Sequence, residues 1–101
     1  MKIEYQSKII TSKDVSSSET AWKIKDAFIV IDYYYSLGQI ILGGDILSSS
    51  LQYTYDNWYY NIDNAAGKNT NLKNSVNIAK EYILNYTKRN GLNNYVVFVL
   101  Q

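Results

Sequence analysis

The chain contains neither cysteine nor histidine among its 101 residues. Without cysteine it can form no disulfide and no thiolate nucleophile, which fits a reducing compartment. Without histidine it lacks the commonest general base and the commonest metal ligand of proteins. We therefore expect no catalytic residue, no metal site and no cofactor, and predict that the chain is not an enzyme.

Long hydrophobic runs are missing as well. The first residues reach the acidic Glu4 before any apolar stretch forms, and no later run approaches the roughly 20 residues that cross a bilayer. We expect a cytoplasmic protein with no membrane partner, folded as a single domain over residues 1–101.

Proline is absent and arginine occurs once, whereas tyrosine, asparagine, isoleucine and lysine are abundant. The codons of these abundant residues are rich in A and T, so the base composition of the genome can account for much of the excess. The number of tyrosines is therefore weak evidence of a binding surface, and their positions are better evidence.

Positive charge is missing from the middle of the chain. Residues 26–63 carry a net charge of −5 with no Lys or Arg, whereas residues 1–25 carry +2 and residues 64–101 carry +4. The five acids of the middle are Asp26, Asp32, Asp45, Asp56 and Asp63. A dedicated nucleic-acid binder normally shows a concentrated basic stripe, so this distribution favours a positively charged protein partner. The alternative is that the five carboxylates are scattered over a solvated surface.

Two stretches have the apolar spacing of helices. Apolar residues recur every three to four positions over residues 24–35, and Leu37-Gly38 ends this helix with a glycine cap. The helix begins either at the capping box Ser16–Glu19 or at the first of these apolar residues. A second helix is predicted over residues 71–88, with Asn90-Gly91 as its cap.

Three further stretches are typical of strands. Residues 40–47 are apolar and interrupted by Gly43-Gly44-Asp45, which indicates a bulge, and residues 51–60 show the alternation of a half-buried strand. Residues 95–100 are almost wholly apolar, as in a central strand, and residues 3–11 fit an edge strand or an extended arm. The economical arrangement is an α+β fold, a small and mostly antiparallel sheet of three to four strands with two helices packed on one face.

Aromatic residues gather in the predicted strand of residues 51–60. Rings at positions 53, 55, 58, 59 and 60 supply both of its faces, and only one face can belong to the core. Asp45 and Asp56 lie on adjacent predicted strands and are the candidates for a catalytic carboxylate pair. Such a pair needs a cleft that a chain this small seldom forms, so the pattern favours binding over catalysis.

Several short motifs occur together over residues 19–100. They are Ala21-Trp22, Lys25-Asp26-Ala27, Ile41-Leu42-Gly43-Gly44-Asp45-Ile46, Tyr55-Asp56-Asn57-Trp58-Tyr59, Ser75, Ala79, Glu81-Tyr82-Ile83 and the terminal apolar strand. On these residues the chain resembles the bacterial polymorphic-toxin immunity protein family 40. It departs from the family pattern at Ile46-Leu47, where Val-Tyr is expected, and at Tyr60, where the family often has a small residue.

The resemblance implies a cytoplasmic immunity protein that serves in bacterial competition, as in contact-dependent inhibition. Its partner would be a cognate toxin domain with a basic surface, such as a nuclease, whose active site it occludes. The candidate toxin-binding residues are Asp45, Tyr55, Asp56, Trp58 and Tyr59, with Asp32 and Asp63 as charges at the rim. For Gly43, Gly44 and Trp58 the alternative is a role in determining the fold.

A competing function is a small single-strand nucleic-acid binding module that stacks bases on Tyr and Trp rings. Such modules place cations among the rings, and residues 26–67 supply none.

Overall fold

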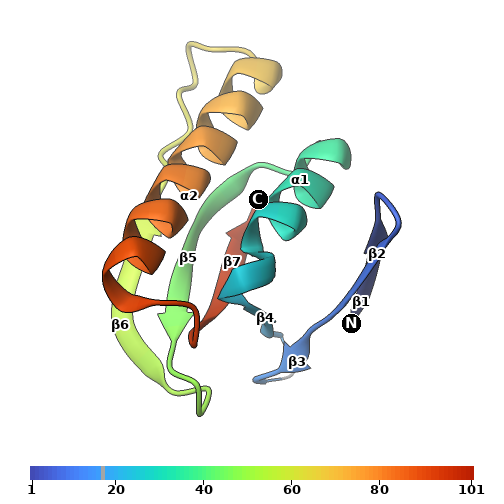
Figure 1. Cartoon of the computed structure of the whole chain (residues 1–101). Helices are drawn as coiled ribbons and strands as arrows, with labels where there is room; N and C mark the ends of the chain where they lie inside the picture. The colour runs from blue at the N-terminus through green and yellow to red at the C-terminus, as the bar shows by residue number, and fades with distance from the viewer. Residues whose placement is uncertain (17) are drawn as a thin grey trace.

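The computed structural model describes residues 1–16 and 18–101, and its central element is a five-stranded antiparallel sheet (Figure 1). From one edge to the other its strands are β3 (Lys13–Asp14), β4 (Thr20–Lys23), β7 (Tyr95–Leu100), β5 (Ile41–Leu47) and β6 (Tyr53–Tyr59). Helices α1 (Ala27–Ser36) and α2 (Lys68–Asn90) both pack on the same face of this sheet, and the 3₁₀ turn η1 (Ile24–Asp26) leads into α1.

A separate hairpin precedes the sheet. It consists of β1 (Lys2–Tyr5) and β2 (Lys8–Thr11), and it lies beside α1 (Figure 1). Ile3 and Ile10 are buried in the main core, and the ring of Tyr5 meets the ring of Tyr33 edge-on at 6.1 Å. Residues 3–11 therefore form a packed two-stranded hairpin, and neither predicted alternative, a single edge strand or an extended arm, is correct.

The predicted class, α+β with an antiparallel sheet and two helices on one face, is confirmed. The predicted number of strands was wrong, because β3 and β4 were not recognised. They lie in a stretch that resembles a helix start locally, yet Ala21 and Trp22 point to opposite faces of the sheet and are both fully buried. A strand is the conformation that sends consecutive side chains to opposite faces.

The predicted ends of the helices are confirmed at their glycine caps. Gly38 and Gly91 both have positive φ, +70° and +80°, and Gln39 N–H donates to Tyr34 O across the first cap. The first helical turn is η1 at Ile24, so the capping box was the wrong alternative. Of that box, Ser17 lies outside the described residues, and Glu19 O instead accepts a turn hydrogen bond from Val15 N–H at 3.0 Å.

An asparagine fixes the start of α2. The Asn71 side chain is buried, accepts from Asp63 N–H at 2.8 Å and from the Tyr60 hydroxyl, and donates to Gly67 O at 3.1 Å. These bonds tie the end of β6 and the following loop to the first turn of the helix. They explain why α2 begins at Lys68, ahead of the predicted position.

The central place predicted for the terminal strand is confirmed, since β7 pairs with β4 on one side and with β5 on the other. Val96 and Phe98 of β7 belong to the core beneath the helices, whereas Tyr95 and Val97 belong to a smaller cluster on the opposite face. The sheet therefore has a face covered by helices and a second face, which we call the open face.

The Gly43-Gly44 pair makes room for a tryptophan. A methyl group added at Gly44 would overlap the ring of Trp58, and one added at Gly43 would overlap the Trp58 carbonyl oxygen. The Trp58 ring lies beneath α2, 6 % exposed, and stacks on Tyr82 at 4.9 Å between ring centroids. The strand pairing shifts register on both sides of these glycines, which confirms the predicted bulge.

Replacing Gly44 by alanine should therefore destabilise the fold through Trp58. Overpacking of this kind costs roughly 1–3 kcal/mol in the free energy of unfolding. In a Trp58→Leu background the ring is gone, so the same Gly44→Ala change should cost clearly less. Urea denaturation of the four proteins of this double-mutant cycle measures both values. An equal cost in both backgrounds would show that Trp58 does not impose glycine at position 44.

Candidate protein-binding face

The half of the open face over β5 and β6 is formed by residues in two rows across the sheet. In one row Gly43 lies between Tyr59 and Val99, and in the other Asp45 lies between Asn57 and Val97. Val97 belongs to the cluster on the side away from the helices, so the row that contains it faces that side. Because alternate residues of a strand face the same side, the row that contains Val99 faces away from the helices as well. Tyr59 is 76 % exposed there.

The other half of the open face, over β3 and β4, is occupied by apolar side chains and lysines. Ala21, Leu47 and Val97 form a small buried cluster there, against which Val15, Leu51 and Tyr95 pack. Lys13 extends over the Tyr95 ring, with Nζ 5.6 Å from the ring centroid, and Lys23 is paired with Tyr95 across β4 and β7. This half is thus largely filled and carries positive charge, whereas the β5–β6 half carries aromatic and acidic groups.

A groove of about 410 Å³ opens on the β5–β6 half. It is lined by Leu42, Gly43, Gly44, Asp45, Asn57, Trp58, Tyr59, Tyr60, Asn61, Ile62 and Val99. Gly43, which has no side chain, lies between Tyr59 and Val99 in the lining of this groove. The groove therefore has apolar and aromatic walls, with a carboxylate and an amide at Asp45 and Asn57.

Asp45, which lines this groove, has a second carboxylate, that of Glu19, near enough to affect it electrostatically. Burial, and next the nearby charge of Glu19, raise the pKa of Asp45 above its ordinary value. The Tyr53 hydroxyl donates a hydrogen bond to Glu19 Oε1 at 2.5 Å. Among the described residues the only ion pair joins Lys80 and Asp32, so neither of these two carboxylates has a cation in contact. The open face thus holds two carboxylates without a cation in contact, Asp45 on β5 and Glu19 directly before β4.

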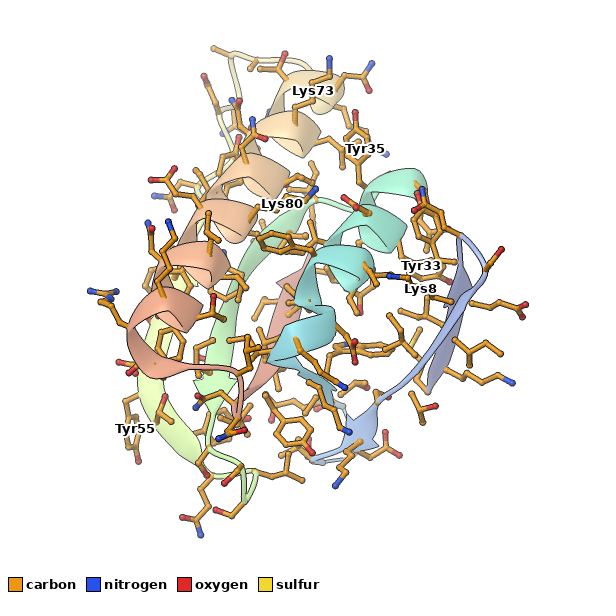
Figure 2. All side chains as sticks on the ribbon, viewed as in Figure 1. Lys8, Tyr33, Tyr35, Tyr55, Lys73 and Lys80 are labelled. Carbon is orange, nitrogen blue, oxygen red and sulfur yellow. The ribbon has the colours of Figure 1, made fainter. Side chains whose placement is uncertain are left out.

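The candidate residues predicted from the sequence lie in different places. Asp45 and Tyr59 are on the open face, and Tyr55 projects from the outer edge of β6, 88 % exposed and with a φ of +69° (Figure 2). Trp58 and Asp56 are on the helix-covered side, where Asp56 Oδ2 accepts from the Tyr86 hydroxyl at 3.1 Å. Asp45 and Asp56 lie on opposite faces and do not form the carboxylate pair considered from the sequence.

The two residues expected as rim charges are also separate from the open face. Asp32 is on α1 and forms its ion pair with Lys80 of α2 at 2.6 Å, in the space between the two helices (Figure 2). Asp63 lies in the loop before α2, where its Oδ1 accepts from Ala65 N–H at 2.9 Å. The acids of the middle segment therefore do not gather on one surface.

Three residues of the open face were not singled out from the sequence as site residues: Glu19, Tyr53 and Asn57. Tyr53 was counted only among the rings of its strand, and Glu19 was assigned to a capping box. Their position next to Asp45 depends on the pairing of strands distant in sequence, which no local pattern contains. Asn57 alone could have been found, because it alternates with Trp58 within one strand.

Over the described residues 1–16 and 18–101, no group of three or more His, Cys, Asp or Glu side chains is arranged to hold a metal ion. No helix in that part of the chain is both long and apolar enough to cross a membrane.

The contact between Tyr53 and Glu19 should be visible in a pH titration. The hydrogen bond to Glu19, followed by burial, raises the pKa of Tyr53 from 10.0 to about 12. The folded chain therefore holds this proton more tightly than the unfolded chain does. The resulting stabilisation is complete below pH 10 and is lost as the pH rises to about 12.

Glu19→Gln should lower the pKa of Tyr53 and remove this pH dependence. NMR titration of ¹³Cζ-labelled tyrosine measures the pKa, with Tyr53→Phe assigning the signal. Glu4→Gln, on the distant hairpin, is the control and should leave the Tyr53 titration unchanged. If Tyr53 titrates identically in the Glu19→Gln protein, the contact does not exist in solution.

Comparison with known proteins adds one finding to this geometry. A family model described as Immunity protein 40 matches residues 11–100, so β1 and most of β2 precede the matched region. No curated protein and no solved structure matches the chain. The family match covers all of the five-stranded sheet and both helices. The chain therefore belongs to the Immunity protein 40 family.

Proposed function

We propose that this chain protects a bacterial cell by binding a cognate toxin domain and covering its active site with the β5–β6 half of the open face. Membership of an immunity protein family supports a toxin as the partner. In this proposal the chain acts in the cytoplasm and contributes contacts but no chemistry of its own.

The observation that carries the proposal is an exposed aromatic surface that no helix covers. Tyr59 is 76 % exposed on the open face, Tyr53 is 40 % exposed near the other end of β6, and Tyr55 extends from the adjoining edge. Tyrosine rings supply a large contact area with few rotatable bonds, and they are enriched at protein interfaces and among the residues that dominate binding energy. The β5–β6 half therefore has the composition of a protein interface.

The charge on this face indicates what kind of surface it fits. Asp45 and Glu19 lack a cation in contact within the described part of the chain, and burial followed by the charge of Glu19 raises the pKa of Asp45. A toxin that acts on a phosphate backbone, such as a nuclease, presents basic side chains in its active site. We infer that the carboxylates speed association with such a site. The tyrosine rings, which become buried when the toxin binds, slow its dissociation.

The competing function, single-strand nucleic-acid binding, has one observation in its favour. Lys13 and Lys23 lie beside the Tyr95 ring on the same open face. A nucleic-acid strand that continued from there onto Tyr59 would pass Asp45 and Glu19, which repel phosphate. We therefore favour the protein partner. Salt-dependent binding of a fluorescent oligonucleotide, lost in Lys13→Ala, would favour the competing function.

Growth rescue in cells tests the proposal directly. A candidate toxin domain, taken from a gene adjacent to the one that encodes this chain, is expressed with or without the chain, and survival is measured. Co-expression should restore growth, and the double variant Asp45→Lys, Tyr59→Ala should lose protection. Loss of anchors at an interface typically weakens binding at least tenfold, about 1.4 kcal/mol each.

A matched control carries the same changes on the helix-covered side. Glu81→Lys, Tyr35→Ala alters net charge equally and also removes one exposed ring, but both positions belong to the helices. This protein should protect as well as the original chain. If neither variant affects survival while both fold normally by circular dichroism, the open face is not the contact surface. If the original chain gives no rescue, the proposed function itself is wrong.

A further inference from the structure

The groove on the open face has an apolar part and a polar part. Leu42, Ile62 and Val99, which is paired with Gly43, form its apolar part, and Asp45 and Asn57 lie at the polar part. Gly43 and Asp45 are two residues apart on β5, which is about 7 Å along a strand. An occupant that touches both parts must therefore carry its polar group at the end of an apolar stem.

The negative charge of the groove favours an occupant whose polar group is a cation. Asp45 has no Lys or Arg in contact among the described residues, and the nearby Glu19 adds a second negative charge. Burial and Glu19 also raise the pKa of Asp45, so the free protein holds this carboxylate in an unfavourable environment. A positive group placed against Asp45 would relieve that repulsion, which makes the groove complementary to a cationic side chain.

We propose that this groove binds an arginine side chain of the toxin, with the guanidinium against Asp45 and Asn57 and the stem between Tyr59 and Val99. The inference rests on the proposed function, since it identifies the anchor by which the toxin would be held.

The chemistry of the walls favours arginine over lysine. A guanidinium is planar, presents several N–H donors to a carboxylate and an amide oxygen together, and stacks on aromatic rings. Asp45, the Asn57 side chain and the Tyr59 ring supply those three kinds of contact within one groove. Guanidinium is also more weakly hydrated than ammonium, so its transfer into a partly apolar groove costs less.

Binding of a small probe tests the groove without the toxin. The probe is N-acetyl-arginine methylamide, added to the ¹⁵N-labelled chain and followed by NMR. We expect chemical-shift changes at the amides of Gly43, Asn57, Tyr59 and Val99. The uncharged citrulline analogue and the lysine analogue should give at least threefold smaller changes at equal concentration. Asp45→Asn should abolish the arginine effect, whereas Asp32→Asn, which alters a carboxylate between the helices, should not.

Each contrary outcome overturns the assignment. Equal shifts with the citrulline analogue would show that charge plays no part, and stronger shifts with the lysine analogue would show that the groove is built for ammonium. Absence of localised shifts with the arginine probe at tens of millimolar would show that the groove is not an arginine site. The only arginine of this chain is Arg89, so dimerisation that Arg89→Ala abolishes would make a second copy the occupant.

Comparison with the growth assay separates this inference from the proposed function. Protection of cells without arginine-probe binding would remove the groove assignment and leave the toxin partner in place. Binding of the arginine probe without protection of cells would leave the groove as an arginine site and remove the toxin as its partner.

Discussion

The ring of Trp58 can lie against β5 only because position 44 has no side chain, and the arrangement of the whole sheet depends on this contact. The ring stacks on Tyr82 of α2 and meets Phe98 of β7 edge-on at 6.0 Å. A single side chain of β6 thus joins one helix to two other strands. A slip of β6 by one residue would turn this ring out and place Asn57 and Tyr59 beneath the helix, so the burial of Trp58 fixes the register.

The same register decides which residues of the two motifs are available to a partner. In the segment Gly43-Gly44-Asp45, Gly44 accommodates the core ring while Asp45 faces away from the helices. In the following strand Trp58 turns inward, and Asn57 and Tyr59 turn outward. The interpretations of these motifs as fold-determining and as contact-forming therefore concern alternate residues of the same strands. Trp58 has the position of a fold-determining residue, and Tyr59 is exposed and can form contacts with a partner.

Much of the fold was predictable because its signals are local. Apolar periodicity and the caps Gly38 and Gly91 located the helices, and the double glycine located the bulge. The short strands β3 and β4 were not predictable, since Trp22 is held by pairing with Val96 near the other end of the chain. The tyrosine at position 60, a departure from the family pattern, is explained by its bond to Asn71, which is equally non-local.

For the candidate site, the residue types were predictable and their grouping was not. Counting charge along the chain suggested one acidic surface, but three of the five acids form separate contacts in different parts of the fold. Asp32 has Lys80, Asp56 has the Tyr86 hydroxyl, and the Asp63 carboxylate has a backbone N–H. Asp45 differs because its charged neighbour, Glu19, has the same sign. The open face is therefore distinguished by one uncompensated carboxylate beside a groove, and net charge alone would not reveal it. A cationic partner gains more from pairing with such a carboxylate than from pairing with one that is already satisfied, because binding removes a repulsion that the free chain carries.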